Sequence, residues 1–107
     1  MRKVAVYRNH EFAGILTEED RTKYVFIYED DYFQNDVLPA ISLTIPKTKK
    51  EHTCEILFPF FFNMLSEGVN KRLQSIQLKI DEEDYFGLLM ATAQYDTIGA
   101  ISVKPIL

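Results

Sequence analysis

A run of phenylalanines in the middle of the chain constrains the fold most. The stretch 58–68 reads Phe-Pro-Phe-Phe-Phe-Asn-Met-Leu-Ser-Glu-Gly, with four phenylalanines in its first five positions. Pro59 suits the first position of a helix, because its missing N–H would have no intrahelical partner there. Gly68 can supply the positive φ that ends a helix. We therefore expect a helix that starts at Pro59, is apolar on all sides before Asn63 and ends at Gly68.

Two interpretations of this helix remain open. A helix that is apolar all round must be covered on all sides. The first interpretation is that the helix is buried in the core of its own domain, where a single phenylalanine is most often found. The alternative is that one edge of the helix, with the corner Ser66-Glu67-Gly68, contacts another protein.

The length and charge of the chain restrict its class. Its 107 residues suffice for one domain, spanning 1–107, that buries roughly two thirds of its unfolded surface. The net charge of −4 argues against direct binding of nucleic acid, which favours a basic face. The single Cys54 cannot form an internal disulfide, which fits a reducing cytosol. The apolar run 4–7 is too short for a signal peptide, and no stretch is long enough to span a membrane. We expect a cytoplasmic protein.

The first half of the chain has the pattern of an antiparallel sheet. Residues 3–7 are β-branched or aromatic at alternating positions and predict a strand. The apolar residues of 11–17 predict a returning strand, and 24–28 is the strongest strand signal; the three are expected to form a meander. Gly14, within the second strand, indicates a bulge or a close approach of another backbone. The period-two segment 41–45, bounded by prolines, predicts an edge or terminal strand.

The segments between these strands are polar. Asp30 or Asp31 is expected to cap a short helical turn through Tyr32 and Phe33. The stretch 47–52 is expected to be a charged loop.

The second half is expected to be helical. Ser66 is a candidate cap for a second helix, in which Val69, Leu73 and Ile76 are spaced as on one face. The carboxylates of 81–84 are expected to begin a third helix, where they oppose the positive end of the helix dipole. Its expected inner stripe comprises Tyr85, Leu88, Leu89 and Thr92.

The chain is expected to close with a turn at 97–99 and a short strand over 100–103, ended by Pro105. Strands followed by helices and one closing strand predict an α+β fold, with a small antiparallel sheet packed against about three helices. No linker follows the last strand, so the domain is expected to be complete.

The sequence contains no recognisable catalytic constellation. Its four glycines are isolated, which excludes a glycine-rich phosphate loop. His10 and His52, both expected in loops, make no metal site with one cysteine, and Cys54 is expected to be a small, partly buried side chain. The carboxylate clusters lack the spacing of a calcium loop and suit solvated turns and helix caps. We therefore predict a non-enzymatic binding module with no cofactor and no metal.

Several segments together resemble a known family. The segments 4–7, 12–17, 24–28 and 39–46 are similar to the N-terminal subdomain of HipA-type serine/threonine kinases, the toxins of bacterial toxin–antitoxin modules. The stretch 60–68 is similar to that family's Phe-Phe-x-Asn-Leu-Leu-Pro-Glu-Gly, and 95–101 to its Arg-Asp-x-x-Gly-Ala-Val. Ser66 and Tyr95 stand where the family usually has proline and arginine.

The resemblance carries implications for function. In that family the ATP-binding and catalytic residues lie in a kinase core that follows this subdomain, and this sequence ends at Leu107, before that core. The family includes split systems in which the subdomain is a separate HipS-like antitoxin that binds a shortened HipA/HipT-type kinase. A helix-turn-helix HipB-like protein is encoded alongside. The resemblance therefore implies a bacterial antitoxin whose partners are proteins.

The leading hypothesis is a HipS-like protein that binds such a kinase and restrains it. The expected contact residues lie on the rim of the phenylalanine helix and at its exit: Phe62, Met64, Ser66, Glu67, Gly68 and Val69. Phe62 is the expected apolar anchor, since a few such anchors carry most of an interface's free energy. One alternative is an accessory subunit that completes a split kinase and supports its activity. Another alternative is an enzyme that acts on a small molecule. The sequence gives this alternative no support, because it shows no paired acid and base residues.

Overall fold

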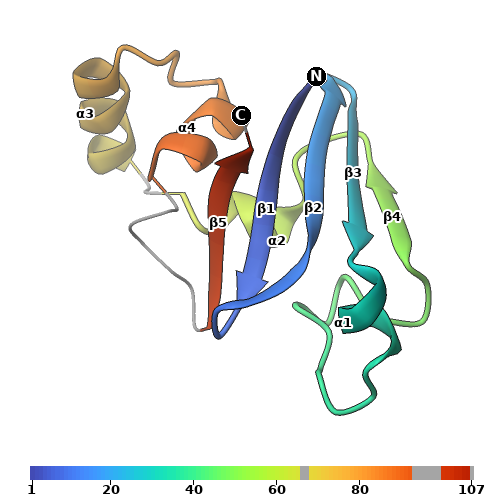
Figure 1. Cartoon of the computed structure of the whole chain (residues 1–107). Helices are drawn as coiled ribbons and strands as arrows, with labels where there is room; N and C mark the ends of the chain where they lie inside the picture. The colour runs from blue at the N-terminus through green and yellow to red at the C-terminus, as the bar shows by residue number, and fades with distance from the viewer. Residues whose placement is uncertain (66–67, 93–99, 107) are drawn as a thin grey trace.

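The structure, a computed structural model, describes residues 1–65, 68–92 and 100–106, which form a five-stranded antiparallel sheet and four helices (Figure 1). The strands are β1 (Arg2–Arg8), β2 (Glu11–Asp20), β3 (Lys23–Tyr28), β4 (Glu51–Cys54) and β5 (Ile101–Ile106), in the order β4-β3-β2-β1-β5. The helices are α1 (Asp30–Gln34), α2 (Pro59–Phe62), α3 (Gly68–Leu78) and α4 (Tyr85–Thr92). The α+β class and the antiparallel meander of β1 to β3 are confirmed.

The register of the strands sets the core on one face of the sheet. Val4 lies opposite Leu16, and Leu16 lies opposite Phe26. All three side chains are fully buried, and they belong to one cluster with residues of α2 and α4. Because successive side chains alternate between faces, this register directs the core toward the helices.

Gly14 lies where the backbone of β3 approaches β2 closely. The pairing of β1 with β2 shifts there: Val6 faces Gly14 while Tyr7 faces Phe12, which leaves Ala13 as an extra residue. A Cβ placed on Gly14 would lie 2.4 Å from the carbonyl oxygen of Ile27. Both the bulge and the close approach predicted at this glycine are confirmed.

The segment 41–45 is a tight turn, so the edge strand predicted there is wrong. A single bridge joins Ser42 to Ile45. The Tyr28 hydroxyl donates to the carbonyl of Ile45 and accepts the backbone N–H of Ile41 at 3.1 Å. Ile41 and Ile45 are thereby drawn into the core, while Leu43 at the turn's tip is 99% exposed. The apolar alternation reflects this turn and not a strand.

Removal of the Tyr28 hydroxyl is expected to loosen this turn. Tyr28→Phe deletes both hydrogen bonds and leaves the carbonyl of Ile45 and the N–H of Ile41 without this partner. The expected loss is about 1–3 kcal/mol of unfolding free energy. Urea denaturation measures it, and hydrogen exchange at Ile41 should accelerate. Exchange at Ile41 as slow as in the wild type would contradict this role for the hydroxyl.

The end of the predicted loop 47–52 is part of the fourth strand, so that prediction is wrong from Glu51 onward. β4 pairs with the edge of β3 that does not pair with β2. The backbone N–H of Tyr28, at the end of β3, donates to the carbonyl of Lys50 at 2.9 Å, one residue before β4 begins. His52 is buried, with Nε2 2.8 Å from the carbonyl oxygen of Pro46 and 3.0 Å from that of Lys49. It therefore fixes the approach to β4 and is not a solvated loop histidine. Cys54 is partly buried, as expected.

Two element boundaries also differ from the prediction. The cap of α1 is Glu29, whose carboxylate accepts the N–H of Tyr32 at 3.0 Å, and not Asp30 or Asp31. The backbone N–H of Glu29 donates to Ala13, which holds this residue at the end of β3. β5 continues through Pro105, which an edge strand tolerates because its outer side needs no donor.

The phenylalanine helix is a single turn, so the prediction of a helix reaching Gly68 is wrong. α2 ends at Phe62, and the next bonds run from Met64 to Phe61 and from Leu65 to Phe62. This three-residue spacing tightens the backbone and turns Phe58, Phe61, Met64 and Leu65 inward. Gly68 begins α3 instead of ending the preceding helix. Ser66, the candidate cap, lies outside the described residues, as does the expected turn at 97–99.

The two longer helices differ in burial. In α4, Leu88 and Leu89 are buried as predicted, together with Phe86, and Tyr85 is half-buried. In α3 the helix is confirmed, but Leu73 and Ile76 are 51% and 67% exposed. α3 lies at the margin of the molecule (Figure 1). Within the described part of the chain, no helix combines the length and hydrophobicity needed to cross a bilayer.

Candidate partner-binding surface

An apolar groove lies between α2 and α4. Five residues line it: Ile56, Leu57, Pro59, Phe62 and Tyr85. The rings of Phe62 and Tyr85 meet edge to face, with centroids 5.0 Å apart. Ile56 is 64% exposed and Phe62 is 38% exposed, although Phe61 beside it is fully buried. The phenylalanine run therefore has an inner side in the core and an outer side at this groove.

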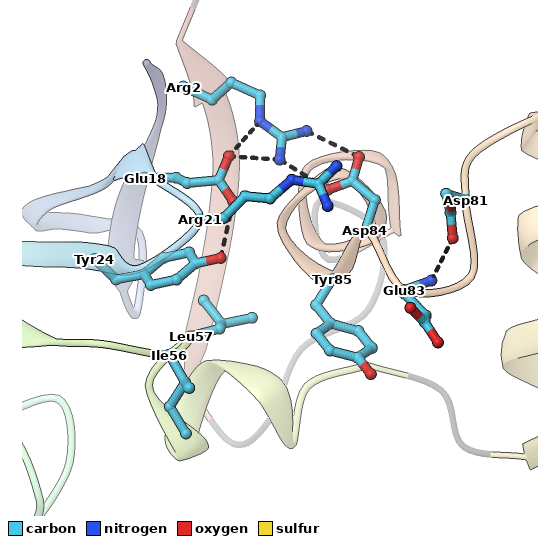
Figure 2. Close-up of a pocket in the computed structure, with 10 residues that line it drawn as sticks. All are labelled: Arg2, Glu18, Arg21, Tyr24, Ile56, Leu57, Asp81, Glu83, Asp84 and Tyr85. Carbon is cyan, nitrogen blue, oxygen red and sulfur yellow. Dashed lines mark hydrogen bonds and ion pairs between the residues drawn. The ribbon is translucent and has the colours of Figure 1, made fainter.

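A polar pocket continues this groove toward the sheet (Figure 2). It shares Ile56, Leu57 and Tyr85 with the apolar part, and it adds a set of charged residues and one tyrosine. These are Arg2, Glu18, Arg21, Tyr24, Asp81, Glu83 and Asp84. We call the two parts together the α2–α4 groove.

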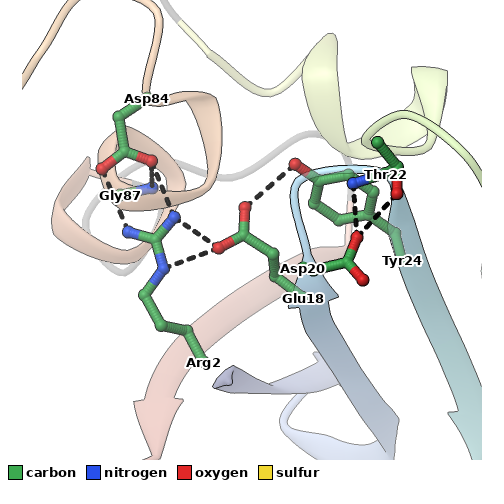
Figure 3. A network of polar contacts seen from close by, with 7 residues as sticks. All are labelled: Arg2, Glu18, Asp20, Thr22, Tyr24, Asp84 and Gly87. Carbon is green, nitrogen blue, oxygen red and sulfur yellow. Dashed lines mark hydrogen bonds and ion pairs between the residues drawn. The ribbon is translucent and has the colours of Figure 1, made fainter.

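Arg2 links the sheet to α4 inside this pocket (Figure 3). Its guanidinium donates to Glu18 through Nε at 2.8 Å and through Nη2 at 2.6 Å, and to Asp84 at 2.8 and 3.0 Å. It also lies over the ring of Phe86 at 5.3 Å. Asp84 accepts the N–H of Gly87 at 3.1 Å and so caps α4. The guanidinium thus holds the first turn of α4 against β1 and β2.

The ionisation of these groups follows from the network. The hydrogen bonds from Arg2 hold the pKa of Asp84 below its usual range, and the nearby Arg21 acts in the same direction. Burial, aided by the bond to Glu18 at 2.9 Å, raises the pKa of Tyr24 to about 12. Asp84 therefore stays ionised and Tyr24 stays neutral at pH 7. We read this cluster as structural, because its charged groups are engaged with one another.

The depressed pKa of Asp84 has a consequence for acid stability. A carboxyl group whose pKa is lowered by folding stabilises the native state above its unfolded pKa, 3.8, and loses this contribution as the pH falls below it. Asp84→Asn should therefore cost about 1–2 kcal/mol at pH 7, and this cost should shrink steadily as the pH falls below 3.8 toward the lowered pKa of the folded state. Thermal melts of both proteins across this range measure the difference. A constant gap between them at all pH values would contradict the role of this carboxylate.

The predicted contact residues occupy different environments. Phe62 lies on the groove with its ring partly exposed, whereas Met64 is 8% exposed and packs into the core. Gly68 and Val69 form the start of α3. Ser66 and Glu67 lie outside the described residues. Among the described residues of this set, Phe62 is the one that borders the groove.

Sequence reasoning missed part of this surface. Tyr85 was expected on the inner stripe of its helix, but its ring instead meets Phe62 at the groove. The sequence did not indicate that Ile56 is exposed at the groove, because its exposure depends on the turn between β4 and α2. Arg2 could not be singled out from the sequence, since its two carboxylate partners are 16 and 82 residues away along the chain.

The other charged clusters of the sequence are used within the fold. Asp20 accepts two hydrogen bonds from Thr22 in the turn after β2. Lys47 donates to the carbonyls of Asn35 and Leu38, both at 2.8 Å. The described residues contain no cluster of three or more acidic, histidine or cysteine side chains that could hold a metal ion.

Comparisons with known proteins agree with one another. A family model described as the HipA N-terminal domain matches residues 4–104. A protein of Haemophilus influenzae (strain ATCC 51907 / DSM 11121 / KW20 / Rd), described only as uncharacterized, is 30% identical over 104 residues, which cover 97% of this chain and 92% of that protein.

A solved structure shows the same likeness in three dimensions. The N-terminal domain of a HipA toxin superposes with a TM-score of 0.74 and 28% sequence identity, and the match covers 100% of this chain and 94% of that one. The family match spans most of the sheet and the helices on both sides of the groove. This chain therefore belongs to the HipA N-terminal domain family.

Proposed function

We propose that this protein is a HipS-like antitoxin that binds a HipA/HipT-type serine/threonine kinase and restrains it. The observation that carries the proposal is the apolar part of the α2–α4 groove, an exposed surface in a chain of the HipA N-terminal domain family. In that family the domain belongs to a kinase toxin. A separate chain with this domain can occupy the same place on a kinase through a protein–protein interface.

Phe62 is the proposed anchor of this interface. Its ring is held edge to face by Tyr85, so little conformational freedom is lost when a partner covers it. Rigid aromatic side chains at the centre of an interface commonly contribute most of the binding free energy. Gly68 and Val69, with Ser66 and Glu67, remain proposed contacts at the adjoining corner. Met64, which is buried, would contribute through the core that it joins.

Other partners and the compartment follow from the same proposal. A helix-turn-helix HipB-like protein is a proposed third member of the complex, and it would supply any contact with DNA. Direct binding of nucleic acid by this chain is not proposed, given its net charge of −4. The proposed compartment is the bacterial cytoplasm, which suits a single unpaired cysteine.

The proposal is tested by expressing this protein with a HipA/HipT-type kinase from the same genome. We expect the two to co-purify, growth inhibition by the kinase to be relieved, and autophosphorylation of the purified kinase to fall when this protein is added. Stimulated phosphorylation would instead identify an accessory subunit that supports the kinase. Failure to co-purify, together with unchanged toxicity, would contradict both roles.

A further inference from the structure

The α2–α4 groove has an acidic rim beside its apolar floor. The polar pocket is lined by two arginines and four carboxylates, Glu18, Asp81, Glu83 and Asp84, so its lining carries a formal charge of −2. The guanidinium of Arg2 is bound on two sides by Glu18 and Asp84. Of the two arginines that line this pocket, Arg21 is therefore the one whose charge faces the rim.

The rim carboxylates that face solvent come from the turn before α4. Asp81 and Glu83 are both exposed, and Asp81 accepts the N–H of Glu83 at 2.8 Å. This hydrogen bond fixes the turn. The two carboxylates line the same pocket as the apolar side chains of Ile56, Leu57 and Tyr85 (Figure 2). A ligand that fills the apolar part therefore lies beside a pocket lined by the exposed carboxylates of Asp81 and Glu83. Phosphate-bearing ligands, nucleotides included, are disfavoured there because like charges repel.

We infer that the groove receives a kinase segment in which an apolar side chain is closely followed by lysine or arginine. The apolar side chain would cover Ile56 and Phe62, and the cationic one would reach Asp81 and Glu83. This inference rests on the proposed function, and it adds the chemistry by which the partner is recognised. Such charge pairs at a rim act mainly on association rate and partner choice, and they weaken with salt.

A second copy of this chain is the competing occupant. α3 carries Arg72 next to Leu73, and Leu73 and Ile76 are exposed, so it offers the same combination of apolar and basic groups. Arg72 lies 4.0 Å from Glu82 of its own chain, so this cation already has a carboxylate neighbour and is less suited to a second one. We therefore assign the groove to the kinase and expect the isolated protein to be monomeric.

The test compares two doubly neutralised variants by titration against the purified kinase. Asp81→Asn with Glu83→Gln removes the rim charges and keeps the oxygen that accepts the N–H of Glu83. Asp36→Asn with Glu51→Gln removes two exposed charges outside the groove lining and is the matched control. We expect the rim variant to bind about tenfold more weakly at about 50 mM salt, with most of that loss gone at about 300 mM. The control should change affinity less than about twofold.

Each of the other possible results would contradict the inference about what binds in the groove. Equal effects of the two variants, or tighter binding by the rim variant, would overturn the inference and leave the proposed function standing. Complete failure of the unmodified protein to bind the kinase would overturn both. Sedimentation of the isolated protein is an additional test. If the unmodified protein is a dimer and the rim variant is a monomer, the groove binds a second copy of this chain. Thermal melts check that all variants fold alike.

Discussion

Gly14→Ala is expected to lower the free energy of unfolding by about 3 kcal/mol or more, among the larger effects of a single substitution. The added Cβ would lie 2.4 Å from the carbonyl oxygen of Ile27 and 2.7 Å from the ring of Phe26. The first contact is with backbone, so β2 and β3 must separate to relieve it. Urea denaturation measures the loss, and the melting temperature should fall by roughly 10–20 °C.

Thr17→Ala is a suitable control for this prediction. Thr17 lies on the same strand, pairs with Lys3 and Val25, and is only partly buried. Its replacement should cost about 1 kcal/mol or less. If Gly14→Ala were as mild as this control, β2 and β3 would not approach as closely at this point as the structure shows.

Phe61→Ala is expected to cost about 3–5 kcal/mol, because it leaves a cavity in the centre of the core. The ring is fully buried and packs against Phe58, Phe60 and Phe26, with centroids 6.2, 5.3 and 6.0 Å away. A loss of this size is a large part of the stability of a small domain. Equilibrium unfolding in urea, with the slope compared to that of the wild type, measures it.

Phe62→Ala provides the matched comparison, since it removes the same ring one position later. Its side chain is 38% exposed and contacts Tyr85 at the groove, so we expect a cost of about 1–2 kcal/mol. The two adjacent phenylalanines should thus differ clearly in their effect on folding. Equal losses would mean that both rings are core residues and that the groove lacks an exposed aromatic edge.

The parts of the fold that followed from sequence are those with local, regular patterns. β1 and β3 are rich in β-branched and aromatic residues, β2 has an apolar centre, and α4 follows a run of carboxylates that ends in its cap, Asp84. The errors arose where distant partners decided the conformation. The turn 41–45 depends on the hydroxyl of Tyr28, and β4 depends on the free edge of β3.

The candidate site was predictable only in part. The phenylalanine run indicated a surface that a small domain covers incompletely, and the exposed edge of Phe62 agrees with that reasoning. The extent of the helix was wrong, because i to i+3 bonds after α2 turn Met64 and Leu65 inward. Ile56 and Tyr85 join the groove through packing between segments far apart in sequence, which no local pattern encodes.

The most direct test of the account is the affinity of the purified HipA/HipT-type kinase for Phe62→Ala, measured by calorimetric titration. Leu43→Ala is the control, since Leu43 is 99% exposed in the segment between α1 and β4 and does not line the groove. The account predicts that Phe62→Ala weakens binding roughly thirtyfold, the size expected of a central aromatic anchor, while Leu43→Ala leaves the dissociation constant within about twofold of the wild type. Wild-type affinity in a correctly folded Phe62→Ala protein would contradict it.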